Sequence, residues 1–196
     1  MIWNEFAIAR SISLYTLSRK CLMLVDRCNW TGHECDVLGV TNDLRIIDVE
    51  IKISRGDLKA DARKDKWWRT WFAYDEHRVE PCPRPRLWPQ KVWKHYYALP
   101  AEIWDDKLLD AMPSPMSGVL LLFGDPQKPV VRSIRRATPD RGADRIQPHQ
   151  VMQIARLANL RMWDAYAQSE DRAAGESYWR QAFKRETGRD FPAEAA

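Results

Sequence analysis

The stretch Ile46-Ile47-Asp48-Val49-Glu50-Ile51-Lys52-Ile53-Ser54 alternates apolar and polar side chains with a period of two. This is the period of a β-strand, in which successive side chains point to opposite faces of a sheet. One face would carry the aliphatic side chains, and the other would carry Asp48, Glu50 and Lys52. Taken alone, such a pattern is typical of a half-exposed edge strand with a solvated charged face. The flanking sequence favours a different interpretation.

Upstream of this stretch the sequence predicts a helix and two more strands. Apolar residues recur at helical spacing over residues 2–19, which favours an amphipathic helix with Glu5 in its first turn. A strand over 21–25 and a hairpin loop over 26–33 follow, and residues 35–41 form a second strand. The strand over 45–54 is therefore the third of a meander.

Downstream, the sequence predicts a crossover and more strands. Ser54-Arg55-Gly56-Asp57 opens a charged helix, with Ser54 or Asp57 available as its N-cap. The Pro-rich residues 80–89 cannot continue a helix or a central strand, so residues 67–90 form a Trp- and Pro-rich surface excursion. Strands over 92–99, 116–123 and 129–137 and a helix over 101–112 complete a mixed α/β core.

The chain divides by composition into a core and a C-terminal appendage. Residues 138–147 are rich in Pro, Asp, Arg and Gly, which indicates a linker. Apolar periodicity then predicts helices over 148–168 and 176–185. We therefore expect a core over residues 1–137 and a linker with a helical appendage over residues 138–196.

Composition excludes some classes of protein and leaves others open. No apolar run approaches the ~18 residues that a membrane-spanning helix needs, and the N-terminus lacks a signal-peptide pattern, so we expect a cytoplasmic protein. The 31 Lys and Arg residues exceed the 27 Asp and Glu residues by only four, which is too mild to indicate a nucleic-acid-binding protein by bulk charge.

The cysteines and histidines are not spaced as they are in common metal-binding motifs. No C-x-x-C pair occurs, and a zinc site from Cys28, His33, Cys35 and Cys82 would match no common spacing. The sequence therefore predicts reduced structural thiols, and it assigns no catalytic role to a histidine.

Asp36, Glu50 and Lys52 are the candidate catalytic residues of this sequence. Asp36 lies on the strand before Glu50, so the two carboxylates can converge across adjacent strands. Together with the backbone carbonyl of Ile51, they are ligands that Mg²⁺ or Mn²⁺ would accept. Lys52 can orient or deprotonate an attacking water or stabilise charge on a phosphate. This set predicts phosphodiester hydrolysis.

The same residues resemble the PD-(D/E)XK nuclease superfamily, which includes restriction endonucleases, archaeal junction resolvases and RecB-type nuclease domains. The matching residues are Asp36 within residues 34–40 and Glu50-Ile51-Lys52 within residues 46–54. The continuation over residues 54–64, followed by the Tyr-rich strand and Ala-Leu-Pro of residues 94–100, looks like the MmcB-like DNA repair branch. The resemblance covers roughly residues 1–123.

The resemblance implies a restriction-endonuclease-like αβββαβ core with a mixed central sheet. It implies a metal at Asp36 and Glu50, Lys52 as the catalytic lysine, and a further acidic ligand from the first helix, which maps to Glu5. Cys35 departs from the proline or small residue usual before the aspartate, and the excursion over residues 67–90 interrupts a stretch that is short in the family. Glu34 is either an additional ligand or a solvated carboxylate at the rim.

Basic residues supply candidate contacts to the DNA backbone. They lie on the helix after the third strand and near the last strand, and a solvated surface is the alternative. The residues expected to bind nucleic acid are Lys59, Lys64, Arg132, Arg135 and Arg136.

The sequence thus predicts a Mg²⁺-dependent deoxyribonuclease acting in repair, recombination or phage DNA processing. The rival is a non-catalytic binding or inhibitor protein, for example phage-encoded, that reuses the nuclease fold. The Trp-rich excursion or the C-terminal helices would then contact a protein partner. The same tryptophans could instead stack bases or pack internally. Assembly into a homodimer stays open.

Overall fold

A computed structural model of the chain describes residues 3–75, 78–85, 88–89 and 91–187. Its contacts divide the chain into two compact units, Met1–Ala155 and Arg156–Ala196.

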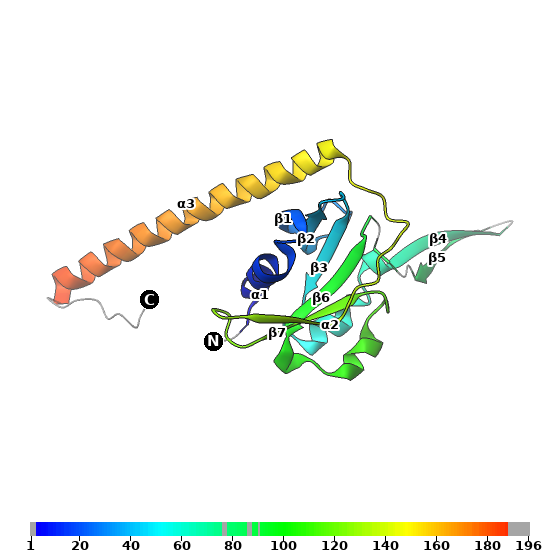
Figure 1. Cartoon of the computed structure of the whole chain (residues 1–196), viewed down its shortest axis with the longest axis horizontal. Helices are drawn as coiled ribbons and strands as arrows, with labels where there is room; N and C mark the ends of the chain where they lie inside the picture. Colours follow the sequence, from blue (N-terminus) through cyan, green and yellow to red (C-terminus); the bar gives the residue numbers. More distant parts are fainter. Residues whose placement is uncertain (1–2, 76–77, 86–87, 90, 188–196) are drawn as a thin grey trace. The chain divides into compact units, whose positions relative to one another are not determined.

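A six-stranded mixed sheet forms the framework of the first unit (Figure 1). Its order is β1-β2-β3-β6-β7-β8, with β3 parallel to β6, β6 parallel to β7, and the other neighbours antiparallel. The strands span Cys21–Cys28 (β1), Cys35–Thr41 (β2), Ile46–Ile51 (β3), Lys94–Pro100 (β6), Gly118–Phe123 (β7) and Val130–Arg135 (β8). The mixed α/β class expected from the sequence is confirmed, and the first elements follow the expected αβββαβ order.

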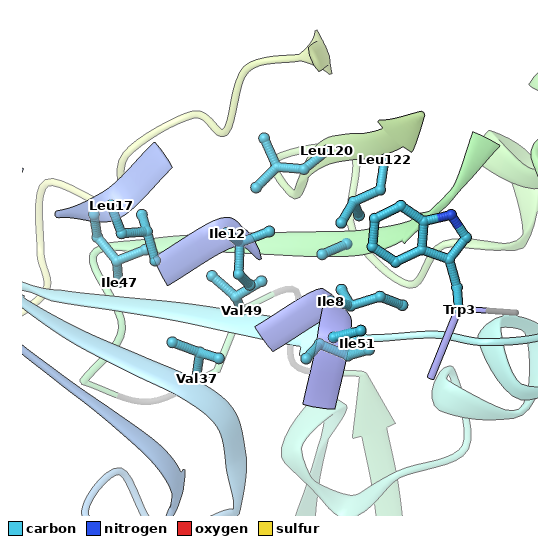
Figure 2. Close-up of a cluster of buried hydrophobic side chains, with 12 residues drawn as sticks. Trp3, Ile8, Ile12, Leu17, Val37, Ile47, Val49, Ile51, Leu120 and Leu122 are labelled. Atoms are coloured by element: carbon cyan, nitrogen blue, oxygen red, sulfur yellow. The ribbon is translucent and has the colours of Figure 1, made fainter. Parts of the chain in front are cut away.

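Helix α1 (Glu5–Ile12) covers one face of the sheet. The side chain of Asn4 caps it by accepting the Ala7 N–H at 2.8 Å, and a π-helical turn, Ser13–Leu17, continues it. Figure 2 shows the core beneath it, where α1 and the aliphatic face of β3 meet. The buried side chains labelled there are Trp3, Ile8, Ile12, Leu17, Val37, Ile47, Val49, Ile51, Leu120 and Leu122.

Helix α2 (Arg55–Asp61) belongs to the opposite face. Ser54 is its N-cap and accepts the Asp57 N–H at 3.1 Å, which decides between the two predicted caps. Leu58 of α2 packs in a second core with Tyr97, Leu99 and Leu121.

The helix predicted over residues 101–112 is wrong in type. The segment forms two short 3₁₀ helices, Ala101–Ile103 and Asp106–Ala111. Trp104 has extended backbone with ψ 142°, which ends the first turn. The Asp105 side chain then caps the second by accepting the Lys107 N–H at 3.0 Å.

The excursion contains a separate two-stranded antiparallel sheet, β4 (Trp68–Asp75) with β5 (Arg78–Pro85). Prolines occupy every second position of β5 at Pro81, Pro83 and Pro85. Because alternate N–H groups of a strand point the same way, this spacing leaves one edge of β5 without donors from Pro81 to Pro85, and such an edge suits a two-stranded ribbon. The expectation that this stretch stays out of the central sheet is confirmed.

The C-terminal appendage is one helix instead of the two predicted. Helix α3 runs over Pro148–Thr187 without interruption. Residues 169–175 contain two alanines and no proline, so only Gly175 opposes the helix there, at about 1 kcal/mol. Residues 138–147 contain no helix or strand, and within them Ile146 is buried and its N–H donates to the Leu44 carbonyl at 2.8 Å. Across the described residues, every helix is too short or too polar to cross a membrane.

Candidate active site: a buried carboxylate and lysine cluster

The charged face of β3 is buried. β3 lies between β2 and β6, and all six of its residues are buried. Asp48 is 0%, Glu50 2% and Lys52 1% exposed, so the interpretation as a solvated edge strand is wrong. Lys52 follows the strand, and its N–H still donates to the Ala98 carbonyl of β6 at 3.0 Å. A face of this kind requires compensating charges nearby.

Glu50 receives these charges from three lysines. Lys52 Nζ lies 2.8 Å from Oε1, and Lys66 Nζ lies 2.7 Å from Oε2. Lys64 Nζ also donates to Oε1. Lys64 and Lys66 follow α2, which therefore places two ammonium groups over the third strand. Burial would raise the pKa of Glu50, but Lys66 and Lys52 hold it below its usual value.

Asp61, the last residue of α2, is the second acceptor of the cluster. Its Oδ2 accepts from Tyr97 Oη at 2.6 Å and from Trp67 Nε1 at 3.0 Å. Its Oδ1 lies 3.2 Å from the ammonium groups of both Lys52 and Lys64. Burial alone would raise the pKa of Asp61, but the lysines and these hydrogen bonds hold it far below its usual range. Sequence reasoning did not select Asp61, although Asp57 and Asp61 lie four residues apart on one helix.

Asp36 lies beside this cluster at the start of β2. Its Oδ2 accepts the Ile51 N–H at 2.6 Å. Burial and the negative charge of Glu50 raise the pKa of Asp36 to about 6. The structure thus brings Glu50 and Lys52 into direct contact and places Asp36 within electrostatic reach of both.

The donors at this position fit a hard divalent cation. A cation shared by Asp36 and Glu50 would offset the repulsion that raises the pKa of Asp36. Both Glu50 oxygens hold ammonium groups, so a metal must take the place of one of them. Lys64 can leave, because its side chain is 50% exposed whereas those of Lys52 and Lys66 are 2% exposed.

A histidine and aspartate group extends the buried face. Asp48 Oδ2 contacts His33 Nε2 at 2.8 Å and lies 3.9 Å from His95 Nε2. Burial lowers the pKa of His95 to about 4, whereas the pKa of Asp48 falls to about 2 despite burial because of the His33 hydrogen bond. Spacing alone did not reveal this group, because His95 meets Asp48 through the parallel pairing of β3 with β6.

The remaining expected acidic ligands lie outside the cluster. Glu5 is exposed in the first turn of α1, and within the described part of the chain no ion pair joins it to Lys52. Glu34 is exposed, in agreement with a solvated rim carboxylate.

The expected DNA contacts occupy different environments. Lys59 is exposed on α2, whereas Lys64 is held in the cluster. Arg132 lies over the Phe123 ring at 5.2 Å, and Arg136 is exposed. Arg135 donates from Nε to the Ser117 carbonyl at 2.7 Å, so its guanidinium is already hydrogen-bonded within the protein.

A register shift in β8 brings two of these arginines to the side of the sheet that carries the cluster. Val119 pairs with Arg135 and Leu121 with Arg132, and the shift lies between these pairs. Val119 and Leu121 both belong to the core beside α2. Arg132 and Arg135 therefore share the face that carries Glu50.

Comparisons with known proteins identify a fold but no family. No family model matches the chain, and no curated protein matches it. A solved structure of a protein of unknown function from Silicibacter pomeroyi is similar, with a TM-score of 0.52 and 16% identity over 88% of this chain and 94% of that chain. At this identity the likeness shows the fold alone.

Proposed function

We propose that the chain is a divalent-cation-dependent nuclease that hydrolyses DNA phosphodiester bonds at Asp36, Glu50 and Lys52. The observation that carries the proposal is the Glu50–Lys52 ion pair, 2.8 Å long and 2% exposed on both sides, with Asp36 beside it. A buried ion pair contributes little net stability, because removing each ion from water costs several kcal/mol. A cluster of this kind is better explained by chemistry than by folding.

In this proposal Asp36 and Glu50 hold Mg²⁺ or Mn²⁺. The ion supplies charge stabilisation at the phosphate and lowers the pKa of water bound to it. Lys52 supplies a second positive charge, and its ammonium is kept in place between Glu50 Oε1 at 2.8 Å and Asp61 Oδ1 at 3.2 Å. The hydrogen bonds from Tyr97 and Trp67 fix Asp61 in turn. Asp61 is thus a positioning residue.

Lys64 is the group that exchanges partners in this scheme. Its half-exposed ammonium contacts Glu50, and it would be released if a metal took its place there. At the rim it is free to bind a phosphate of the DNA backbone, which is the role expected of it from the sequence.

Arg132, together with Lys59, extends the basic surface available to the backbone. β8 is separated from β3 by three strand spacings, or about 14 Å. Contacts at this distance from the reacting phosphate would position the duplex without reading its sequence. A role in DNA repair, recombination or phage DNA processing and a cytoplasmic location accompany this proposal, and cutting both strands would favour a homodimer.

The test is cleavage of labelled linear, circular and forked DNA in Mg²⁺ or Mn²⁺. We expect cleavage by the unmodified chain and a loss of at least 100-fold in Glu50→Gln, which removes a metal-binding charge, and in Lys52→Met, which removes a positive charge at the phosphate. Glu34→Gln is the matched control, since it removes an exposed carboxylate two residues from Asp36, and it should cleave normally. Thermal melting verifies that each variant is folded. Full activity in both folded active-site variants would refute the assignment.

One observation favours the rival, a non-catalytic binding protein. The three lysines already neutralise Glu50 and Asp61 by direct contact, as a permanent structural cluster would. Trp67 and Trp88 of the excursion are buried, and Trp68 is 42% exposed, so the last of these is available to a protein partner. Calorimetry separates the proposals. Mn²⁺ binding that is lost in Asp36→Asn supports the enzyme, and the absence of any binding supports the rival.

A further inference from the structure

A second group of metal-ligating side chains surrounds Asp48, whose carboxylate also lies close to Glu50 and His95. It combines His33, which precedes β2, with Cys35 of β2, Asp48 of β3 and His95 of β6. The ligand atoms of His33, Cys35 and Asp48 all lie within 4.8 Å of one another, and Asp48 is also close to His95. Asp48 is shared by these two groups, so His95 would have to move closer to His33 and Cys35 for all four side chains to hold one ion.

Two atoms of these side chains are buried without a hydrogen-bond partner. They are Asp48 Oδ1 and His95 Nε2, and both residues are 0% exposed. His95 Nδ1 lies 3.0 Å from Ser117 Oγ. When Nδ1–H donates to this hydroxyl, the lone pair of Nε2 is directed toward Asp48. A carboxylate and an imidazole lone pair that face each other without a proton between them leave a place for a cation.

Two of the separations among these ligand atoms are close to those of a tetrahedral site. Zinc lies about 2.0–2.3 Å from its ligands, so its ligand atoms are about 3.3–3.6 Å apart. Cys35 Sγ is 3.8 Å from His33 Nε2, and His95 Nε2 is 3.9 Å from Asp48 Oδ2. The 2.8 Å contact between His33 Nε2 and Asp48 Oδ2 is a hydrogen bond that would have to open by about 0.5 Å.

We propose that His33, Cys35, Asp48 and His95 bind one zinc ion. One thiolate and one carboxylate balance the two positive charges of Zn²⁺, and both imidazoles are neutral. The nitrogen and sulfur donors favour zinc over Mg²⁺, which prefers oxygen. Binding breaks the S–H bond of Cys35, forms the S–Zn bond and releases the proton to the buffer.

The surroundings support the ligands individually. Thr31 Oγ1 lies 3.3 Å from His33 Nδ1 and 3.4 Å from Cys35 Sγ, so it is within hydrogen-bond distance of both side chains. Lys66, whose charge lowers the pKa of Asp48, is bound to Glu50 Oε2 at 2.7 Å. Burial and Asp48 hold the pKa of the Cys35 thiol far above its usual value, which is the condition that a bound cation reverses.

The test is zinc titration of the reduced full-length chain against a chromogenic chelator. We expect one zinc per chain, and an affinity at least ten-fold lower in Cys35→Ser. Cobalt in place of zinc should give thiolate-to-metal charge-transfer absorption that Cys35→Ser abolishes. Cys28→Ser is the matched control, because Cys28 is also a free cysteine, is 2% exposed and pairs with Cys35 across β1 and β2. It should retain the affinity and the spectrum.

His33→Asn provides an independent variant if Cys35→Ser fails to fold, because the His33 side chain is 15% exposed and lies at the rim of the site. It should also weaken zinc at least ten-fold. The proposal is overturned if the unmodified chain binds no zinc, or if folded Cys35→Ser or His33→Asn binds it with unchanged affinity. Asp36→Asn should bind zinc normally, so this site and the proposed nuclease site can fail separately.

Discussion

Replacing Asp61 by Asn tests whether charge balance holds the buried cluster together. Glu50 and Asp61 contact the ammonium groups of Lys52, Lys64 and Lys66. Lys64 donates to Glu50 Oε1, and the other contacts are 2.7–3.7 Å long. The substitution keeps the shape of the side chain and removes one negative charge from a residue that is 0% exposed. Breaking a buried ion pair by removing one partner costs about 3–5 kcal/mol. We expect a loss near the lower limit, about 3 kcal/mol, because half-exposed Lys64 can turn to solvent.

The assay is urea denaturation, with Asp57→Asn as the matched control. Asp57 lies 3.6 Å from Lys52, but its side chain is 41% exposed. Removing its charge should therefore cost less than about 1 kcal/mol. A double variant, Asp61→Asn with Lys66→Met, removes one charge of each sign and should recover part of the loss. Equal midpoints for Asp61→Asn and Asp57→Asn, at equal slope, would refute the reasoning.

Three further perturbations give results that differ in sign. Asp36→Asn should raise the free energy of unfolding by about 1 kcal/mol at pH 7 in the presence of a metal chelator, because it removes the repulsion between Asp36 and Glu50. Calorimetry should show that the same substitution abolishes Mn²⁺ binding. As the pH falls from 6.5 to 4, protonation of Asp36, with its pKa raised to about 6, stabilises the fold, whereas His95, with its pKa lowered to about 4, destabilises it. Melting temperatures of the unmodified chain should change little over this range, while those of Asp36→Asn fall steadily. Gly118→Ala should cost at least about 2 kcal/mol by urea denaturation, because its Cβ would lie 2.3 Å from the ring of Tyr96.

The parts of the fold that the sequence predicted are those that local chemistry determines. The alternation over residues 46–54 fixed β3 and the identity of its two faces, and the polar turns placed the hairpins around it. The N-cap of α2 is also a local feature, because the Ser54 side-chain oxygen accepts an N–H of the adjacent helical turn and needs no residue far away in sequence. Local signals also kept the Pro-rich stretch out of the central sheet.

The errors concern interactions between residues far apart in sequence. The charged face of β3 looked solvated because its burial depends on β6, which begins at Lys94. Asp61 is fixed in the cluster in part by Tyr97, which lies 36 residues away in sequence. His95 meets Asp48 by the same parallel pairing. The spacing of residues in the sequence cannot reveal a site whose ligands lie on two strands that a long crossover connects.

The buried charges of the described residues point to two places where the metal-free protein lacks positive charge. Despite burial, contacts with lysines lower the pKa values of Glu50 and Asp61, and the hydrogen bond with His33 lowers that of Asp48. Asp36 and Cys35 have raised pKa values, and each lies at one of the two proposed metal sites.

These two groups predict different proton release on metal binding. Asp36, with a pKa of about 6, is largely ionised at pH 7, so Mn²⁺ should release few protons. Cys35 is a thiol at that pH, so Zn²⁺ should release about one. Calorimetry in two buffers of different ionisation enthalpy measures both values. At pH 5.5, about half a unit below the pKa of Asp36, Mn²⁺ should release more than half a proton, because the carboxyl is then mostly protonated. Zinc binding without proton release would show that Cys35 is not a ligand, and Mn²⁺ release that does not rise between pH 7 and pH 5.5 would remove Asp36 from the other site.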